Sequence, residues 1–139
     1  MTGIRVVHKK SRNAMSISEE TTKIKGEHYM EVTQYQNLAA RTINPALTNE
    51  QMQDHALKGM VGEIGEINSI YQKVYQGHEF DEEHVKKELG DLMWFIAEYC
   101  TGCGWNLDDI CQMNIDKLRA RFPDGFEVDK SIHRSEGDI

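Results

Sequence analysis

The sequence predicts an all-α fold of four to five helices, and three observations lead to this expectation. Apolar residues recur at helical spacing through most of residues 29–122. Helix start and stop signals separate these periodic stretches, whereas no stretch alternates between apolar and polar residues as a strand would. The chain has only two prolines, Pro45 and Pro123, so long helices are unobstructed.

The first predicted helix covers about residues 29–42. Asn44-Pro45 ends it, because proline disfavours helical backbone in the residue that precedes it. One side of this helix carries Val32, Tyr35, Leu38, Ala39 and Thr42.

The second predicted helix covers about residues 49–76. Thr48 and Gln51 have the spacing of a capping box at its start, and Gly77 is a natural stop at its end. Its apolar row consists of Met60, Ile64, Ile67, Tyr71 and Val74, with Leu57 and Val61 beside it.

Two more helices follow. Asp81 is the predicted cap of the third helix, which ends near Gly102. Its apolar row consists of Val85, Leu89, Leu92, Met93, Ile96 and Cys100. Asn106 is the predicted cap of the fourth helix, which ends before Pro123. The short connection between the second and third helices favours an antiparallel hairpin.

Composition narrows the class of protein. A chain of 139 residues with 39% hydrophobic and 28% charged residues fits one globular domain. The net charge of −7 argues against a stable nucleic-acid partner, and no apolar run approaches the about 20 residues that span a membrane. Three cysteines and no recognisable secretory signal favour reduced thiols and a cytoplasmic location.

The polar ends of the chain are expected to lie outside the helical domain. Residues 1–26 are interpreted as a flexible N-terminal segment, residues 27–126 as the domain, and residues 127–139 as a C-terminal tail. The first segment contains a small basic cluster, formed by Arg5, Lys9, Lys10 and Arg12. The tail residues that could reach over a neighbouring site are Ser131, His133 and Arg134.

Two similar pairs of acids border the apolar rows of the second and third predicted helices. Glu63 and Glu66 lie three residues apart, and Glu88 and Asp91 repeat this spacing. The two pairs lie at heights along a helical hairpin that differ by only about one turn. The geometry of the connecting loop can absorb this offset, so the two pairs are expected to meet. Four carboxylates in a partly dry cluster repel one another and need protons or a cation. Oxygen ligands favour Mg²⁺ as that cation, with Mn²⁺ as an alternative.

Two other interpretations stay open for these acids. One is a catalytically silent helical interaction module in which the metal supports folding only. The other is a di-iron carboxylate bundle, although that chemistry uses Glu-x-x-His motifs, and the nearest match is Asp81-x-x-His84 at a helix cap. The histidines interpreted as surface or loop residues without ligand spacing are His28, His55, His78, His84 and His133.

The fourth predicted helix carries a polar and cationic edge. Asn114 falls among its apolar positions, where an amide needs a hydrogen-bond partner. Lys117 and Arg121 extend this edge by one turn each. Such an edge suits phosphate oxygens and sugar hydroxyls.

Several motifs together resemble the MazG-like nucleoside triphosphate pyrophosphohydrolases, an all-α superfamily that includes dimeric dUTPases and the dCTP pyrophosphatase. They are GEIGE at 62–66, ELGD at 88–91 and NIDKLRARFPDGF at 114–126. YQNLAART at 35–42 is similar to the opening helix of the short members, so the resemblance covers about residues 29–134.

The family pattern is E-E-x-x-E, a spacer, and then E-x-x-D. Gly62 stands where the first glutamate of this pattern would be, which departs from the founding MazG sequences. The residues that match the last four acids are Glu63, Glu66, Glu88 and Asp91.

The resemblance implies a MazG-like bundle and a reaction. A nucleoside triphosphate substrate would be cut between its α- and β-phosphates, in nucleotide-pool house-cleaning. The four acids would hold Mg²⁺, and a carboxylate would take a proton from water, with Glu63 and Glu66 as the catalytic candidates. Oligomerisation through helices is also implied, as a homodimer or homotetramer.

The resemblance also implies substrate contacts. The family's Asn and Lys in the last motif bind substrate, which transfers to Asn114 and Lys117 in this chain. Arg121 is a further candidate on the same helix, and Gln36 in the first helix is a candidate for a contact with the base.

Overall fold

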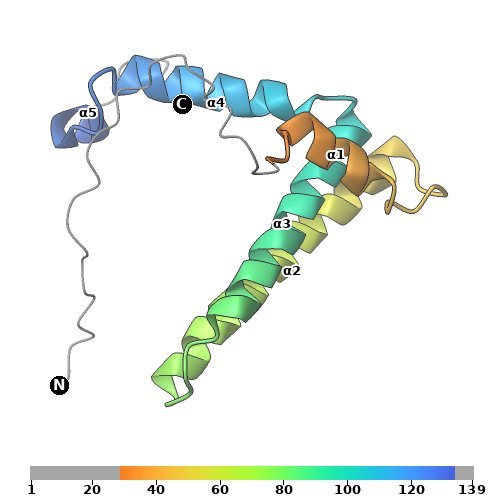
Figure 1. Cartoon of the computed structure of the whole chain (residues 1–139), viewed down its shortest axis with the longest axis horizontal. Helices are drawn as coiled ribbons and strands as arrows, with labels where there is room; N and C mark the ends of the chain where they lie inside the picture. Colours follow the sequence, from red (N-terminus) through yellow and green to blue (C-terminus); the bar gives the residue numbers. More distant parts are fainter. Residues whose placement is uncertain (1–28, 134–139) are drawn as a thin grey trace.

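The computed structural model describes residues 29–133 and contains five helices, with no strand in that range (Figure 1). The expected all-α fold is therefore confirmed. The expected N-terminal segment, its basic cluster, His28 and Arg134 lie outside the described residues. The helices are α1 Val32–Ala40, α2 Asn49–Tyr75, α3 Glu82–Cys103, α4 Leu107–Arg121 and α5 Val128–Ile132.

α2 and α3 form a long antiparallel hairpin, and local signals set its ends (Figure 1). Thr48 begins α2 with the predicted capping box, since its hydroxyl accepts from the amide of Gln51 and the side chain of Gln51 accepts from the amide of Thr48. Gly77 follows α2 with a φ of +94°, a conformation that glycine adopts at little cost. The carboxylate of Asp81 then accepts from the amide of His84 at 3.0 Å and caps α3.

The face of α2 that packs on α3 advances in alternating steps of four and three residues, as in coiled-coil packing. Its buried and half-buried members are Ala56, Met60, Glu63, Ile67, Ile70 and Val74. On α3 the corresponding positions are Val85, Glu88, Leu92 and Phe95. Glu63 and Glu88 therefore occupy positions in the helix interface that apolar residues would normally fill. Two members of the predicted row on α2 differ, since Ile64 and Tyr71 are half or more exposed.

α1 lies against the open end of the hairpin, where it covers α3 and the start of α4 (Figure 1). The buried cluster at this junction consists of Ala39, Ala97, Cys100 and Leu107. The side chain of Gln36 joins the elements, because it donates to the carbonyl of Trp105 at 2.9 Å and accepts from the amide of Leu107 at 2.8 Å.

α4 leads away from the hairpin, and α5 lies beyond its far end (Figure 1). Asn106 occupies the N-cap position of α4 as predicted, but its side chain makes no capping hydrogen bond. α5 falls within the part of the chain that was interpreted as a tail. Among residues 29–133, no helix has both the length and the apolar character that crossing a membrane requires.

Candidate metal and active site

The helical hairpin brings together carboxylates from its two helices. Ligand oxygens of Glu63, Glu88 and Asp91 lie within 4.8 Å of one another. Glu66 belongs to a second, overlapping group with Glu88 and His84, whose ligand atoms also lie within 4.8 Å of one another. The predicted meeting of the two acid pairs is thus what the structure shows, while the function of these acids as metal ligands stays a prediction.

The four acids differ in exposure because they occupy different faces of their helices. Glu88 is only 7% exposed and Glu63 is half-buried, since both point into the contact between α2 and α3. Glu66 and Asp91 are exposed at the edge of this contact. The arrangement therefore has a buried carboxylate at its base and open carboxylates at its rim, where a ligand can enter.

Glu63 carries the electrostatic signature of the cluster. Burial is the main cause that raises the pKa of its carboxyl above the usual range. A hydrogen bond with Glu88 raises this pKa further, as do the negative charges of Glu66, Glu88 and Asp91. The ionised cluster is thus strained by repulsion, and a bound cation would relieve that strain.

His84 was interpreted from the sequence as a surface or loop residue without ligand spacing, whereas the structure places it beside the acids. Its Nε2 lies 2.6 Å from Oε1 of Glu88, one helical turn further along α3. Its Nδ1 faces Asp81 at 3.9 Å. The signal in the sequence was the spacing of four between His84 and Glu88, which places two side chains on one helix face.

The candidate residues of α4 lie on a different part of the chain from the acids. α4 makes its main contact with α1, and it leads away from the hairpin that carries the acids (Figure 1). Asn114 and Lys117 are exposed on this helix, and Arg121 is half-buried with its guanidinium 5.8 Å from the ring centre of Phe122. Within one chain, the structure does not bring these three side chains to the acids.

Gln36, the candidate for a base contact, is 8% exposed. Both ends of its amide bond to the protein, since Nε2 reaches the carbonyl of Trp105 and Oε1 receives the amide of Leu107. The structure thus gives Gln36 a role in joining α1 to the start of α4. Its contact with a base stays a prediction.

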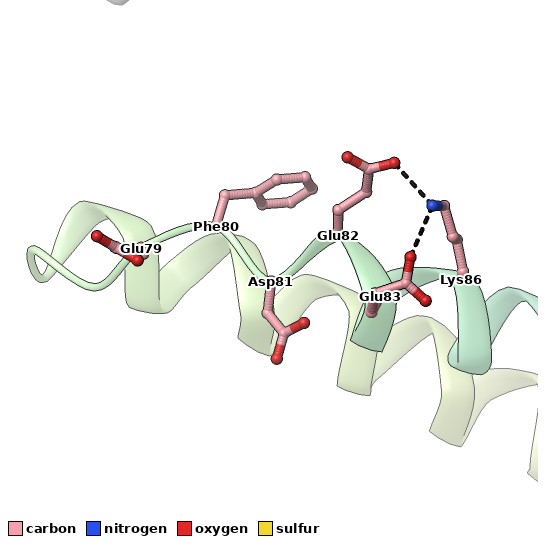
Figure 2. Close-up of a pocket in the computed structure, with 6 residues that line it drawn as sticks. All are labelled: Glu79, Phe80, Asp81, Glu82, Glu83 and Lys86. Atoms are coloured by element: carbon pink, nitrogen blue, oxygen red, sulfur yellow. Dashed lines mark hydrogen bonds and ion pairs between the residues drawn. The ribbon is translucent and has the colours of Figure 1, made fainter.

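A hollow with a volume of about 560 Å³ lies at the turn between α2 and α3 (Figure 2). Lys86 bridges Glu82 and Glu83 there, with Nζ 2.9 Å from an oxygen of each. The acids that line this open hollow are exposed, and its one lysine, Lys86, is paired with two of them. The converging acids further along the hairpin are therefore the better candidate site.

Comparison with known proteins agrees with the geometry. The family model of the MazG nucleotide pyrophosphohydrolase domain matches residues 51–126, more than half of the chain, and this span includes all four acids. The chain is also 28% identical over 85 residues to the Gene 37 protein of Mycobacterium phage L5, which covers 58% of this chain and 69% of the phage protein. No solved structure matches the chain. The chain therefore belongs to the MazG nucleotide pyrophosphohydrolase family.

Proposed function

We propose that this protein hydrolyses a nucleoside triphosphate to the monophosphate and pyrophosphate, with Mg²⁺ or Mn²⁺ as its metal. The observation that supports this most is the convergence of carboxylates from α2 and α3 in a chain of the MazG family. The proposed role is the removal of unwanted nucleotides from the nucleotide pool.

The donor set suits a hard divalent ion. Glu63, Glu88 and Asp91 offer oxygens that are close enough to share one ion, and Glu66 lies beside them. A divalent ion bound there would neutralise triphosphate charge and lower the pKa of a coordinated water. Burial and the neighbouring negative charges raise the pKa of Glu63, which gives the protein an independent reason to hold a cation.

Glu63 and Glu66 are the proposed catalytic residues. The reaction adds one water across the bond between the α- and β-phosphates, and the proton of that water goes to a carboxylate and then to solvent. A raised pKa makes Glu63 a stronger base than an ordinary carboxylate. Glu66 is more exposed, so it is the acid that solvent and substrate reach more easily.

Asn114, Lys117 and Arg121 are proposed to bind phosphate oxygens and sugar hydroxyls. Because α4 leads away from the acids within one chain, these side chains must come from a second copy or arrive by a swing of α4 near Gly104. The first route agrees with the proposed homodimer or homotetramer. The proposed base contact of Gln36 would have to compete with the bonds that this side chain makes to the protein.

A substrate panel tests the proposal. Purified protein is incubated with ribo- and deoxynucleoside triphosphates and modified bases, with Mg²⁺ or Mn²⁺, and pyrophosphate and monophosphate are both measured. Glu63→Gln should lower kcat by at least about 100-fold. Glu83→Gln, an equal change on the exposed side of α3, should leave kcat unchanged. Absence of pyrophosphate from every substrate would overturn the proposal.

A non-catalytic helical module is the second candidate, and the exposed apolar residues of α2, α3 and α4 favour it. It predicts that a divalent ion raises the melting temperature and that a nucleoside triphosphate adds nothing further. A triphosphate that raises the melting temperature in the presence of the ion would favour the enzyme instead.

A further inference from the structure

His55 on α2 and Glu98 on α3 form a polar pair in the hairpin, with 2.8 Å between Nδ1 and Oε2. Glu98 follows Asp91 by seven residues, and His55 precedes Glu63 by eight, which corresponds to about 10 and 12 Å along the helices. The pair thus lies about two helical turns from the acids. A nucleotide whose phosphates lie at the acids extends over a similar distance to the edge of its base.

Two aromatic side chains occupy the step between the acids and this pair. Trp94 and Phe95 follow Asp91 by three and four residues, so they lie one turn further along the same face of α3. The ring of His55 lies beside both, with its centre 6.4 Å from that of Trp94 and 5.6 Å from that of Phe95. Both aromatic side chains are half-buried. The surface between the acids and the pair is therefore aromatic and partly accessible, which suits the stacking of a base.

The hydrogen-bonding atoms that the pair leaves unused are acceptors. The ionised carboxylate of Glu98 can only accept, so Nδ1 of His55 donates to it. A neutral imidazole has one donor and one acceptor, which leaves Nε2 of His55 as an acceptor. Oε1 of Glu98 is an acceptor without a partner among the described residues. The indole N–H of Trp94 already donates to the hydroxyl of Thr42 at 2.7 Å.

Exposure gives the two members of the pair different roles. The side chain of His55 is 53% exposed and can touch a ligand, whereas that of Glu98 is 1% exposed and can act only through the imidazole. A buried oxygen without a partner costs stability. The contribution of the pair to the fold therefore does not by itself explain the arrangement.

We propose that His55 reads the base of the nucleotide and that Glu98 positions His55, so that the site prefers a base with an exocyclic amino group, such as cytosine or adenine. An amino group donates to Nε2 of His55. Uracil and hypoxanthine present a carbonyl at the same position, and two facing acceptors form no hydrogen bond. This inference rests on the proposed function for the place of the phosphates, and it adds the class of base.

Pairs of substrates that exchange the amino group for a carbonyl test this preference. The values of kcat/KM for CTP and UTP, and for ATP and ITP, are measured at slightly alkaline pH with Mg²⁺. Wild type should favour the amino member of each pair at least about tenfold. His55→Ala should treat both members alike. Glu98→Gln should also reduce the preference, because an amide can donate as well as accept and so no longer determines which nitrogen of His55 carries the proton.

Gln53→Ala is the matched control, because it removes another hydrogen bond between α2 and the end of α3, from Nε2 of Gln53 to the carbonyl of Gly102 at 3.0 Å. It should keep the wild-type preference. The preference compares two substrates on one variant, so a purely structural role of His55 would leave it unchanged. Glu98→Gln conserves volume and keeps the test available if His55→Ala unfolds, which circular dichroism establishes.

Binding separates this inference from the proposed function. The affinities of CTP and UTP analogues with a methylene group between the α- and β-phosphates are measured by calorimetry with Mg²⁺. Hydrolysis without a preference for amino bases, or a preference that survives in both His55→Ala and Glu98→Gln, would overturn the inference and leave the function standing. Tighter binding of the CTP analogue, lost in the two variants, by a protein that hydrolyses no triphosphate would uphold the inference and overturn the function. Absence of both binding and hydrolysis would overturn both.

Discussion

His55 on α2 holds the buried carboxylate of Glu98 on α3, with 2.8 Å between Nδ1 and Oε2. The side chain of Glu98 is 1% exposed, whereas that of His55 is 53% exposed. The second oxygen of Glu98, Oε1, has no hydrogen-bond partner in the described part of the chain. This pair thus joins the two helices of the hairpin through an acid that water cannot easily reach. Within the described residues, His55 provides the hydrogen bond that Glu98 makes.

Removing His55 should destabilise the fold because it leaves a buried carboxylate unpaired. We expect His55→Ala to lower the free energy of unfolding by about 2 kcal/mol, below the usual cost of breaking a fully buried pair because His55 is half-exposed. Adding Glu98→Met, which removes the buried charge at similar volume, should recover most of that loss. Urea unfolding of the two variants and wild type measures both effects.

Lys58→Ala is the matched control for this pair, because Lys58 forms an ion pair with Asp54 on the same helix with both side chains exposed. It should change the free energy of unfolding by less than about 1 kcal/mol. If His55→Ala cost no more than Lys58→Ala, the contact with Glu98 would contribute little to the fold.

Gly59 makes a second specific contact between the helices of the hairpin. A Cβ atom added at Gly59 would overlap the ring of Phe95, whereas a Cβ atom added at Gly62 would meet open space. Gly59→Ala should therefore lower the free energy of unfolding by about 1–3 kcal/mol. Gly62→Ala should raise it by up to about 1 kcal/mol, since alanine favours the helix. Thermal unfolding distinguishes the two, and equal effects would show that Phe95 moves aside freely.

Helix ends were predictable where a side chain or a glycine determines them. Thr48, Asp81 and Gly77 do so through local bonds and backbone conformation, and the structure confirms all three. The expected start of the first helix near residue 29 was early, because Glu31 at the N-cap makes no side-chain bond and nothing local fixes that end. Asn106 is a residue type that often caps helices, and it occupies the N-cap position of α4, but its side chain makes no capping hydrogen bond. The sequence alone does not show whether such a bond forms.

The candidate site was predictable as far as helix periodicity reaches. The spacing of three residues within each acid pair placed the carboxylates on the facing sides of a hairpin, and they do meet. The partner of His55, and the approach of Glu66 to His84, depend on the register between α2 and α3, which a single sequence does not state. The sequence also does not determine the direction that α4 takes after Gly104. The separation of Asn114 from the acids could therefore not be predicted.

The raised pKa of Glu63 predicts how stability depends on pH in the absence of divalent ions. Between the ordinary pKa of a glutamate, about 4.3, and the higher folded value, the folded state binds more protons than the unfolded state. The free energy of unfolding should therefore fall as pH rises through that window. Glu63→Gln should remove this part of the slope, and Mg²⁺ should weaken it by stabilising the ionised carboxylate. Urea unfolding at a series of pH values measures the slope.

Glu82 supplies a control of opposite sign. A hydrogen bond from Lys86, together with its positive charge, lowers the pKa of Glu82, so its contribution to stability is present above the ordinary pKa and is lost as pH falls. Glu82→Gln should therefore remove a small stabilisation at neutral pH. If Glu63→Gln kept the wild-type dependence of the free energy of unfolding on pH, groups other than Glu63 would be responsible for it.

Apolar side chains exposed on the hairpin predict a contact with a second copy. Leu57, Val61 and Ile64 follow one another at helical spacing on α2 and are 52%, 72% and 56% exposed. Leu89 and Met93 form a similar exposed pair on α3, at 48% and 44%. Rows of this kind are unusual on the free surface of a monomer.

Leu57→Glu should therefore lower the oligomeric state. A charge in the middle of an apolar interface lacks a partner, so the dimer or tetramer expected for wild type should dissociate toward monomer. Light scattering after size-exclusion chromatography measures the mass of each species. Gln76→Glu, which adds the same charge at an exposed polar position directly after α2 and to the side of the apolar row, should keep the wild-type mass. A monomeric wild type would contradict the interface. Equal masses for the two variants would contradict it as well, because a charge within the apolar row would then have the same effect as a charge outside it.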